Sequence, residues 1–239
     1  MRKMTANLKR TVPTPGGAGA KPRVRNPDAT KQRVLDAAKV EFARHGLAGA
    51  RVDAIADRAK ANKQMIYHYF GSKQDLFLAV LEDAYSDIRK AEGKLDLDHL
   101  EPIDALKTLV TFTWNYYLRN PEFLTLVNNE NLHKAAHLKR SKIIGEIHGP
   151  FRARLAGILE RGVRKRVFRS GVDPDQLNLT IAAIGYYYLT NRFTNSIIYS
   201  TNLAAPDALE RRLAFNVETI LRIVLRERRP RRYNNQLVG

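Results

Sequence analysis

Apolar residues recur at helical spacing along the stretch from Arg51 to Phe77. A first short helix is predicted from four apolar residues that lie three or four positions apart and so share one face: Val52, Ile55, Ala56 and Ala59. Asn62 is a residue type that caps helix starts, and so is Ser72. The pattern therefore predicts two short helices with a tight break between them, followed by a third helix that begins after Gly71.

The second of these helices has an apolar side and a polar side. Its apolar side is formed by Met65, Ile66, Tyr69 and Phe70. Its polar side is formed by Lys63, Gln64, Tyr67 and His68. A short helix that packs on a neighbour and keeps its polar side exposed is how a helix-turn-helix presents side chains to a DNA major groove. The four polar residues are therefore candidates for facing the groove.

The chemistry of these side chains suggests individual roles. Gln64 is suited to the N6 and N7 edge of adenine, and Lys63 to guanine or a phosphate. Arg51, ahead of the first short helix, is a further candidate for a phosphate contact, and Asn62 lies at the amino end of the reading helix. The alternative is that one or two of these residues only cap or pack, and for Tyr67 both interpretations stand.

Helical patterns continue on both sides of this stretch, and strand-like alternation is absent. A first helix is expected from Asp28 to about Arg44. The helix that Ser72 caps is expected to include Ile88 on its inward face, and its pattern is broken at Gly93. Further helices are expected at about 102–120, 122–134, 143–167 with a kink or break at Gly149-Pro150, 174–199, and from Pro206 onward. Residues 174–199 are apolar around nearly the whole helix, so this helix is expected to be buried on most sides. The predicted fold class is all-α, with about nine helices.

Interruptions of these patterns predict the domain organisation. A small DNA-binding domain is expected over residues 28–88, with its helix-turn-helix at about 51–70, and a larger helical domain over 89–228. Residues 1–27 are expected to form a disordered basic arm, and 229–239 a basic tail. The arm either follows DNA phosphates or a minor groove, or is an inert tail or a misassigned start.

Composition narrows the classes of partner. The chain has 239 residues and a formal net charge of +17, which favours a polyanion: nucleic acid first, an anionic membrane surface second. A basic protein without a polyanionic partner is the alternative. The absence of cysteine excludes disulfides, thiolate catalysis and Cys-ligated zinc. No apolar stretch approaches the length of a membrane span, and residues 1–27 lack the apolar core of a secretory signal, so a cytoplasmic protein without membrane contact is expected.

The carboxyl-terminal half carries candidates for binding a small molecule, because aromatic residues can enclose an apolar ligand while a few polar residues fix its orientation. The candidates are Trp114, Tyr117, Phe123, Asn131, His133, Tyr187, Asn191 and Arg192. Each aromatic residue could equally be ordinary core. Arg192 lies in an otherwise apolar helix and would suit a carboxylate ligand, or it could pair with Glu218 or Glu210 across a dimer interface.

Metal binding and catalysis find little support in the sequence. His133 and His137 lie four apart on an expected helix, a spacing that can hold a metal, and Glu130 lies one turn earlier. The preferred interpretation is that these groups line a ligand pocket or lie on the surface, so no metal or other cofactor is expected. The HExxH and Gly-x-Ser-x-Gly motifs and a phosphate-cradling glycine loop are absent, so an enzyme is not expected.

One family resemblance covers the amino-terminal region. The sequence Ile-Tyr-His-Tyr-Phe-Gly-Ser-Lys-Gln-Asp-Leu-Phe at 66–77, preceded by Phe42-Ala-Arg-His-Gly46 and Ala54-Ile-Ala56, resembles the DNA-binding domain of the TetR family of bacterial transcriptional regulators. The remainder resembles the family in length and helical layout. Residues 128–134, running on to 138–141, resemble a segment of one subgroup of the family, without pointing to a ligand.

The resemblance implies a function and further site residues. It implies a homodimer whose last two long helices form a four-helix interface, a palindromic operator, and a small-molecule effector bound by residues 89–228. The candidate residues named above suggest that this effector is aromatic or a carboxylate. The resemblance also implies that Tyr69 and Lys73 touch backbone phosphates. The preferred function is a repressor that the effector releases from its operator. The alternative is a non-specific or architectural DNA-binding protein without effector control.

One position departs from the family's pattern. Members usually carry Gly-Val-Ser in the turn before the reading helix, where this chain has Lys60-Ala61-Asn62. The glycine often has a positive φ, which costs a non-glycine residue about 1 kcal/mol. Lys60 therefore either adopts that conformation or shifts the turn, and its charge adds a candidate for a phosphate contact.

Overall fold

The computed structural model describes residues 27–226, which form nine α-helices, one 3-10 turn and a single isolated bridge between Phe168 and Leu225. The helical elements are α1 (Pro27–Gly49), α2 (Val52–Ala59), α3 (Lys63–Phe70), α4 (Lys73–Gly93), α5 (Pro102–Arg119), α6 (Pro121–Leu132), η1 (Leu138–Arg140), α7 (Ile144–Arg164), α8 (Pro174–Ile198) and α9 (Pro206–Val224). The all-α prediction is confirmed for this range. The predicted tail at 229–239 and all but the last residue of the predicted arm at 1–27 lie outside the described residues.

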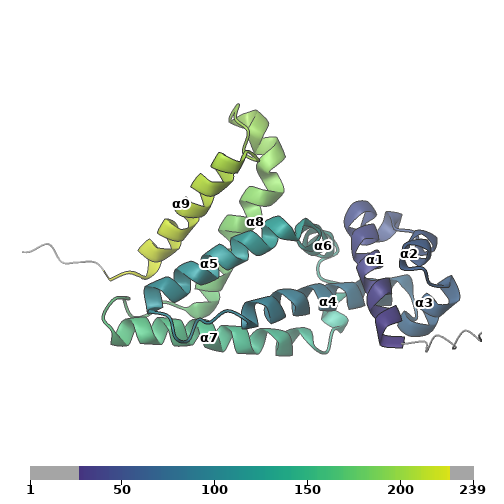
Figure 1. Cartoon of the computed structure of the whole chain (residues 1–239), viewed down its shortest axis with the longest axis horizontal. Coiled ribbons are helices and arrows are strands. Elements are labelled where there is room, and N and C mark those ends of the chain that lie inside the picture. The colour runs from purple at the N-terminus through teal and green to yellow at the C-terminus, as the bar shows by residue number, and fades with distance from the viewer. Residues whose placement is uncertain (1–26, 227–239) are drawn as a thin grey trace, which may run out of the picture.

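The first three helices form a small domain at one end of the molecule (Figure 1). Gly46 bends α1 with a φ of 64°, at the position where the sequence predicts its end. The Phe42 ring of α1 meets the Phe77 ring of α4 edge-on at 5.1 Å between centroids. Ile55 of α2 and Ile66 of α3 complete this core, so each short helix is fixed by one or two apolar anchors.

Helix α4 belongs to both parts of the molecule. Its start is capped by Ser72, whose hydroxyl accepts a hydrogen bond from the Asp75 N–H at 3.1 Å. The helix is continuous to Gly93, so the boundary expected at residue 88 falls inside it. Its first half packs on α1 and its second half on α7 (Figure 1). A single rigid helix therefore joins the small domain to the larger one.

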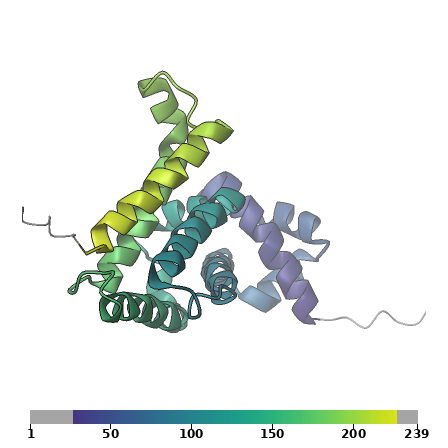
Figure 2. The same cartoon turned by 60° about the vertical axis from the view of Figure 1, so that its left-hand side comes forward.

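The larger domain is built from α5, α7, α8 and α9 around a second apolar cluster. Helix α7 is unbroken from Ile144 to Arg164, so the break expected at Gly149-Pro150 is absent. Helices α8 and α9 form an antiparallel pair that projects from the rest of the molecule (Figure 2). Within the described residues, no helix has the length and apolar character needed to cross a bilayer.

The expectation that α8 is buried on most sides is wrong for the single chain. Phe193 is 66% exposed and Ile197 is 81% exposed. The second half of α8 lies in the projecting pair, where α9 covers only part of its surface (Figure 2). The apolar circumference of α8 therefore exceeds what this chain itself can cover.

The turn after α6 is strained. Lys134 and Ala135 have φ values of 55° and 58°, two consecutive left-handed residues without a glycine. Such a conformation costs a non-glycine residue roughly 1–2 kcal/mol. Contacts from the surrounding structure must therefore hold residues 133–136 in place.

Candidate DNA interface and effector cavity

The helix-turn-helix has the geometry that the sequence predicts. Lys60 ends α2 in the left-handed region, with φ 51° and ψ 46°, so it adopts the conformation usually taken by glycine. The Asn62 side chain accepts a hydrogen bond from the Gln64 N–H at 2.8 Å and caps α3. Ile66 is 2% exposed and anchors α3 in the core. The opposite side of α3 is therefore free to meet a partner.

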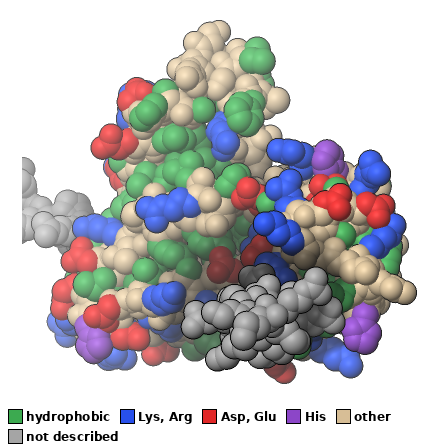
Figure 3. Space-filling view, turned by 45° about the vertical axis from the view of Figure 1, so that its right-hand side comes forward, with side chains coloured by type: hydrophobic (Ala, Val, Ile, Leu, Met, Phe, Trp, Pro, Cys, Tyr) green, Lys and Arg blue, Asp and Glu red, His purple; other side chains and the backbone are tan. Residues whose placement is uncertain are grey.

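All four residues predicted to face the groove are exposed on α3: Lys63, Gln64, Tyr67 and His68. The Lys63 ammonium lies 2.8 Å from the Asp53 carboxylate of α2. This hydrogen-bonded pair raises the pKa of Lys63 and lowers that of Asp53. Because both groups are exposed, the pair is weak and its ammonium can be redirected to a nucleic acid. Figure 3 shows Lys, Arg and His side chains gathered over this domain.

The residues predicted to touch the DNA backbone lie on α3 and on the segments around it. Arg51 is exposed, and its backbone N–H donates to the buried Glu41 carboxylate at 3.1 Å. The Lys73 ammonium donates to the Ala48 carbonyl at 3.1 Å and so ties the start of α4 to the end of α1. Tyr69 is half-buried, with the Lys31 ammonium 5.6 Å above its ring. These residues lie on the same domain as the reading helix, on different elements.

A cavity of about 560 Å³ lies between α4, α5, α6, α7 and α8, and is called the α4–α8 cavity below. Its walls are mainly apolar, and its aromatic members are Tyr85, Tyr117, Phe123, Phe151 and Tyr186. Its other polar members are Arg89, Glu92, Thr113, Asn131, His148 and Asn178. A largely apolar chamber with a few convergent polar groups is typical of small-molecule sites.

Arg89 is the cation of this cavity. Its guanidinium lies over the Phe151 ring, 4.3 Å from the centroid. Nη1 lies 2.8 Å from Glu92 Oε2, yet neither Nη1 nor the buried Nε makes a well-oriented hydrogen bond to any described residue. Buried donors without acceptors are costly. Arg89 can therefore offer hydrogen-bond donors to a ligand.

Burial shifts the titration of the neighbouring groups. It raises the pKa of Glu92 to about 7, against the opposing charges of Arg89 and Arg154. Burial and then the Arg89 charge lower the pKa of His148, so this imidazole is neutral at pH 7. Burial also raises the pKa of Tyr117 to about 12, which keeps its hydroxyl a donor. Partial protonation of Glu92 near pH 7 therefore weakens the negative charge beside the Arg89 guanidinium.

The raised pKa of Glu92 predicts a pH-dependent stability. A carboxyl that titrates near 7 when folded and near 4.5 when unfolded binds more protons in the folded state across that window. The free energy of unfolding should therefore fall by up to about 3 kcal/mol as the pH rises from 4.5 to 7, and then level off. Glu92→Gln should lack this component. Urea unfolding of both proteins from pH 5 to 8 measures it, and a pH-independent difference between them would contradict the assignment.

Only part of the effector set predicted from sequence reaches the cavity. Tyr117, Phe123 and Asn131 line it. Trp114 is buried in the core against Tyr188 at 5.6 Å. The other candidates lie elsewhere: the exposed His133 and Tyr187, and Asn191 and Arg192, whose side chains donate to the Tyr187 and Leu189 carbonyls. The interpretation of Arg192 as a cavity group is wrong, because its guanidinium lies over the Phe193 ring on the projecting pair.

The two charged residues of the cavity, Arg89 and Glu92, were not predicted from the sequence. Arg89 and Glu92 share a helix face with Tyr85 and Ile88, since these residues are spaced three or four apart along α4. Charged residues on the apolar face of a helix are the signal that could have found them. Both residues lie just past the expected domain boundary at residue 88, within a helix that continues from the DNA-binding domain into the larger one.

The histidine pair is not a metal site in the described structure. Helix α6 ends at Leu132, so His133 and His137 do not share a helix as expected. His137 is buried and its Nδ1 lies 2.7 Å from Glu130 Oε2, whereas His133 is exposed. Within residues 27–226, no group of three or more His, Cys, Asp or Glu residues is arranged to hold a metal ion.

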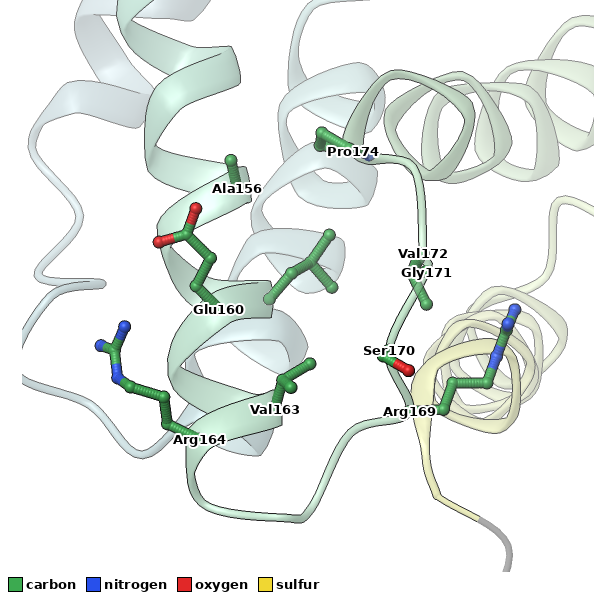
Figure 4. A pocket seen from close by; sticks show the side chains of 10 residues that line it. Ala156, Glu160, Val163, Arg164, Arg169, Ser170, Gly171, Val172 and Pro174 are labelled. Atoms are coloured by element: carbon green, nitrogen blue, oxygen red, sulfur yellow. The ribbon is translucent and has the colours of Figure 1, made fainter.

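A second hollow of about 590 Å³ lies at the far end of the larger domain, between α7 and residues 169–174. Figure 4 shows Arg164 and Arg169 at its opposite edges, one on α7 and one beside α9. The Arg169 Nε donates to the Ile223 carbonyl at 2.6 Å, so this cation already serves the packing of α9. None of the predicted effector residues lies in this hollow, whereas Tyr117, Phe123 and Asn131 line the α4–α8 cavity.

Comparison with known proteins gives two matching family models. Residues 34–80 match the model described as bacterial regulatory proteins, tetR family. Residues 102–220 match the model described as tetracyclin repressor-like, C-terminal domain. Together the two models span the DNA-reading domain and most of the larger domain.

Individual relatives agree with these matches. The chain is 39% identical over 200 residues to the HTH-type transcriptional repressor NicS of Pseudomonas putida, covering 84% of this chain and 94% of that protein. It is 28% identical to the HTH-type transcriptional regulator RutR of Escherichia coli, over 87% of this chain and 95% of RutR. The crystal structure of the transcriptional regulator SCO4942 from Streptomyces coelicolor superposes with a TM-score of 0.59 at 27% identity, covering 83% of this chain and 99% of that one.

Proposed function

Because this chain belongs to the TetR family of bacterial regulatory proteins, we propose that it is a homodimeric repressor that binds a palindromic operator and is released by a small molecule. The observation that carries this proposal is the exposed polar face of α3 on an intact helix-turn-helix. NicS and a second relative, SCO4008 of Streptomyces coelicolor, are both named transcriptional repressors. A DNA-bound role also accounts for the net charge of +17, and it implies a place in the cytoplasm.

In this proposal α3 enters the major groove. Lys63, Gln64, Tyr67 and His68 face the base edges from its exposed side. Arg51, Tyr69 and Lys73 hold the sugar-phosphate backbone, with Lys60 as an additional cation at the turn. Asn62 caps α3 and fixes its amino end, which also faces the phosphates.

The projecting pair supplies the dimer contact. Its exposed apolar residues include Tyr187, Phe193, Ile197, Ile198 and Phe215. Figure 3 shows apolar side chains along the projecting pair. A second copy of the pair would cover them in a four-helix arrangement. The two reading helices would then meet successive major grooves, roughly 34–36 Å apart.

Selection from a random pool of double-stranded DNA tests the operator. The full-length protein should enrich a palindrome whose half-sites are about one helical turn apart. That duplex should compete far better than random DNA at the same salt concentration. Enrichment of no sequence would favour the alternative, a non-specific or architectural DNA-binding protein.

The α4–α8 cavity suggests the class of effector. Arg89 offers unsatisfied donors and a positive charge, while Tyr117, Phe123 and Phe151 provide aromatic walls. A carboxylate fits a guanidinium through two parallel hydrogen bonds. We therefore propose an aromatic carboxylate as the effector, held by Arg89 rather than by Arg192. Its binding releases the operator only if it favours a dimer geometry that does not fit the DNA.

The effector class gives a prediction on Arg89. In thermal-shift titrations, substituted benzoates should stabilise the protein while the matching benzamides should not, because only the acids bring a negative charge to the Arg89 donors that lack hydrogen-bond acceptors. Arg89→Gln should weaken the binding of an active acid by about tenfold to 100-fold. Lys107→Gln, which changes an exposed cation on α5, is the control. Equal binding of acids and amides would refute the carboxylate.

A further inference from the structure

The segment from Asn128 to Ser141 lies outside the reading helix. Within this segment, Asn131 is the residue that lines the α4–α8 cavity. The segment comprises the last turn of α6, the strained turn at Lys134 and Ala135, and the 3-10 turn η1. It is called the strap below. Strained backbone persists only where surrounding contacts over-determine it, and such sites are frequently functional. The contacts that hold the strap therefore indicate its role.

A buried carboxylate closes the strap on itself. Glu130 is 1% exposed. Its Oε1 accepts hydrogen bonds from the backbone N–H groups of His137 at 2.8 Å and Leu138 at 2.9 Å. Its Oε2 lies 2.7 Å from His137 Nδ1. The Glu130 side chain thus holds the backbone at His137 and Leu138 against α6. The cost of burying the Glu130 carboxylate is offset only while all three contacts are made.

The outer end of the strap contacts the first half of α4, which packs on α1 of the small domain. The His137 ring meets the Phe77 ring edge-on at 5.1 Å, and Phe77 meets Phe42 of α1 in the same way. Arg140 forms an ion pair with Asp75 in the first turn of α4. The Ser141 hydroxyl donates to Glu82 at 2.6 Å.

The inner end of the strap is the wall of the α4–α8 cavity. Val127 and Asn131, three before and one after Glu130 on α6, both line the cavity. Asn128 accepts a hydrogen bond from Tyr186 of α8, another cavity residue. Burial and then the charge of Glu130 raise the pKa of Tyr85, which lines the cavity on the α4 side. Glu130 therefore lies between the cavity wall and the DNA-reading domain.

We propose that Glu130 is a positioning residue for operator binding: by holding His137 against Phe77 it fixes the orientation of the DNA-reading domain relative to the α4–α8 cavity. A ligand that displaces Asn131 would act on Glu130, its neighbour in α6. The effect on DNA binding rests on the proposed repressor function. The fixed orientation of the DNA-reading domain rests on the contacts alone.

Distance measurements on the whole chain test the geometry. The protein has no cysteine, so Asp57→Cys on α2 and Lys107→Cys on α5 place two spin labels without competing thiols. Labelled chains are diluted with unlabelled chains, so that only distances within one chain are recorded. Glu130→Gln should broaden the distance distribution, because an amide replaces one acceptor by a donor facing N–H groups. Glu122→Gln, on the same helix, should leave it unchanged.

Binding measurements test the consequence. Glu130→Gln should weaken binding to the selected palindrome by about tenfold, because fewer molecules hold the competent orientation. Binding to random duplex should change by less than about threefold, since phosphate contacts do not need that orientation. A merely structural role would lower the unfolding temperature without changing the ratio of specific to non-specific affinity below that temperature.

A second variant covers the case in which Glu130→Gln does not fold. His137→Phe keeps a ring against Phe77 and removes only the side-chain contact to Glu130. It should broaden the same distribution by a smaller amount. Unchanged widths in every folded variant would overturn the proposal. If the distance distributions broaden but no palindrome is selected, the positioning role of Glu130 stands and the repressor function is contradicted.

Discussion

Replacing Gln64 by Ala is expected to weaken binding to the palindromic operator by about 30-fold to about 10⁴-fold. A base contact contributes roughly 1–3 kcal/mol of discrimination, and a two-fold symmetric dimer loses it twice. Gln64 is exposed on α3, and only its backbone N–H takes part in the cap made by Asn62. The fold should therefore survive the change, and a titration of the selected duplex measures the loss.

The salt dependence separates reading from anchoring. Gln64→Ala removes no phosphate contact, so the slope of log affinity against log salt should stay as in the parent protein. Lys73→Gln is the matched contrast, because its ammonium is proposed to meet a phosphate from the start of α4. It should weaken specific and random duplexes alike and reduce the slope by about 1 for each half-site. Unchanged operator affinity of Gln64→Ala would contradict the assignment of α3 as the reading helix.

The helix-turn-helix could be predicted from sequence because its signals are local. Asn62 and Ser72 cap the helices that follow them, and Ile66 lies on the apolar side of α3, where it is buried. Lys60 was recognised as the one irregular position, and the structure gives it the positive φ that a glycine would have. Local backbone preferences and side-chain periodicity suffice for such a unit.

The effector cavity could be predicted only in part because its walls come from five helices. Tyr117 and Phe123 were found as aromatic residues, whereas the charged pair Arg89 and Glu92 depends on how α4 packs against α7. The contacts of the strap could not be predicted for the same reason, since Glu130 meets His137 only after the chain reverses at Lys134. The periodicity of a single helix shows which of its residues share a face, but not which other segments that face meets in the fold.

The error over α8 has a different cause. A helix that is apolar on most sides indicates burial on most sides, but the pattern does not say whether the covering surface belongs to the same chain. Ile197 and Phe193 are exposed in the single chain although their residue types favour burial. This unfulfilled expectation is itself the argument for a dimer, because large exposed apolar patches mark protein interfaces.

Replacing Ile197 by Glu is therefore expected to separate the dimer and to weaken operator binding by about 100-fold or more. Ile197 is 81% exposed on the projecting pair, so the monomer fold loses little. In the dimer the new carboxylate would be buried without a partner, and two-fold symmetry would repeat this cost in the second copy. Each half-site would then be bound by a single reading head, without the gain from simultaneous engagement.

Leu132→Glu is the matched control, since Leu132 is 80% exposed at the end of α6 and lies outside the projecting pair. Light scattering after size exclusion should give the monomer mass for Ile197→Glu and the dimer mass for Leu132→Glu and the parent chain. Circular dichroism should show the same helix content in all three. A dimeric Ile197→Glu protein with full operator affinity would mean that the exposed face of α8 is not the interface, and another surface would have to set the spacing of the two reading helices.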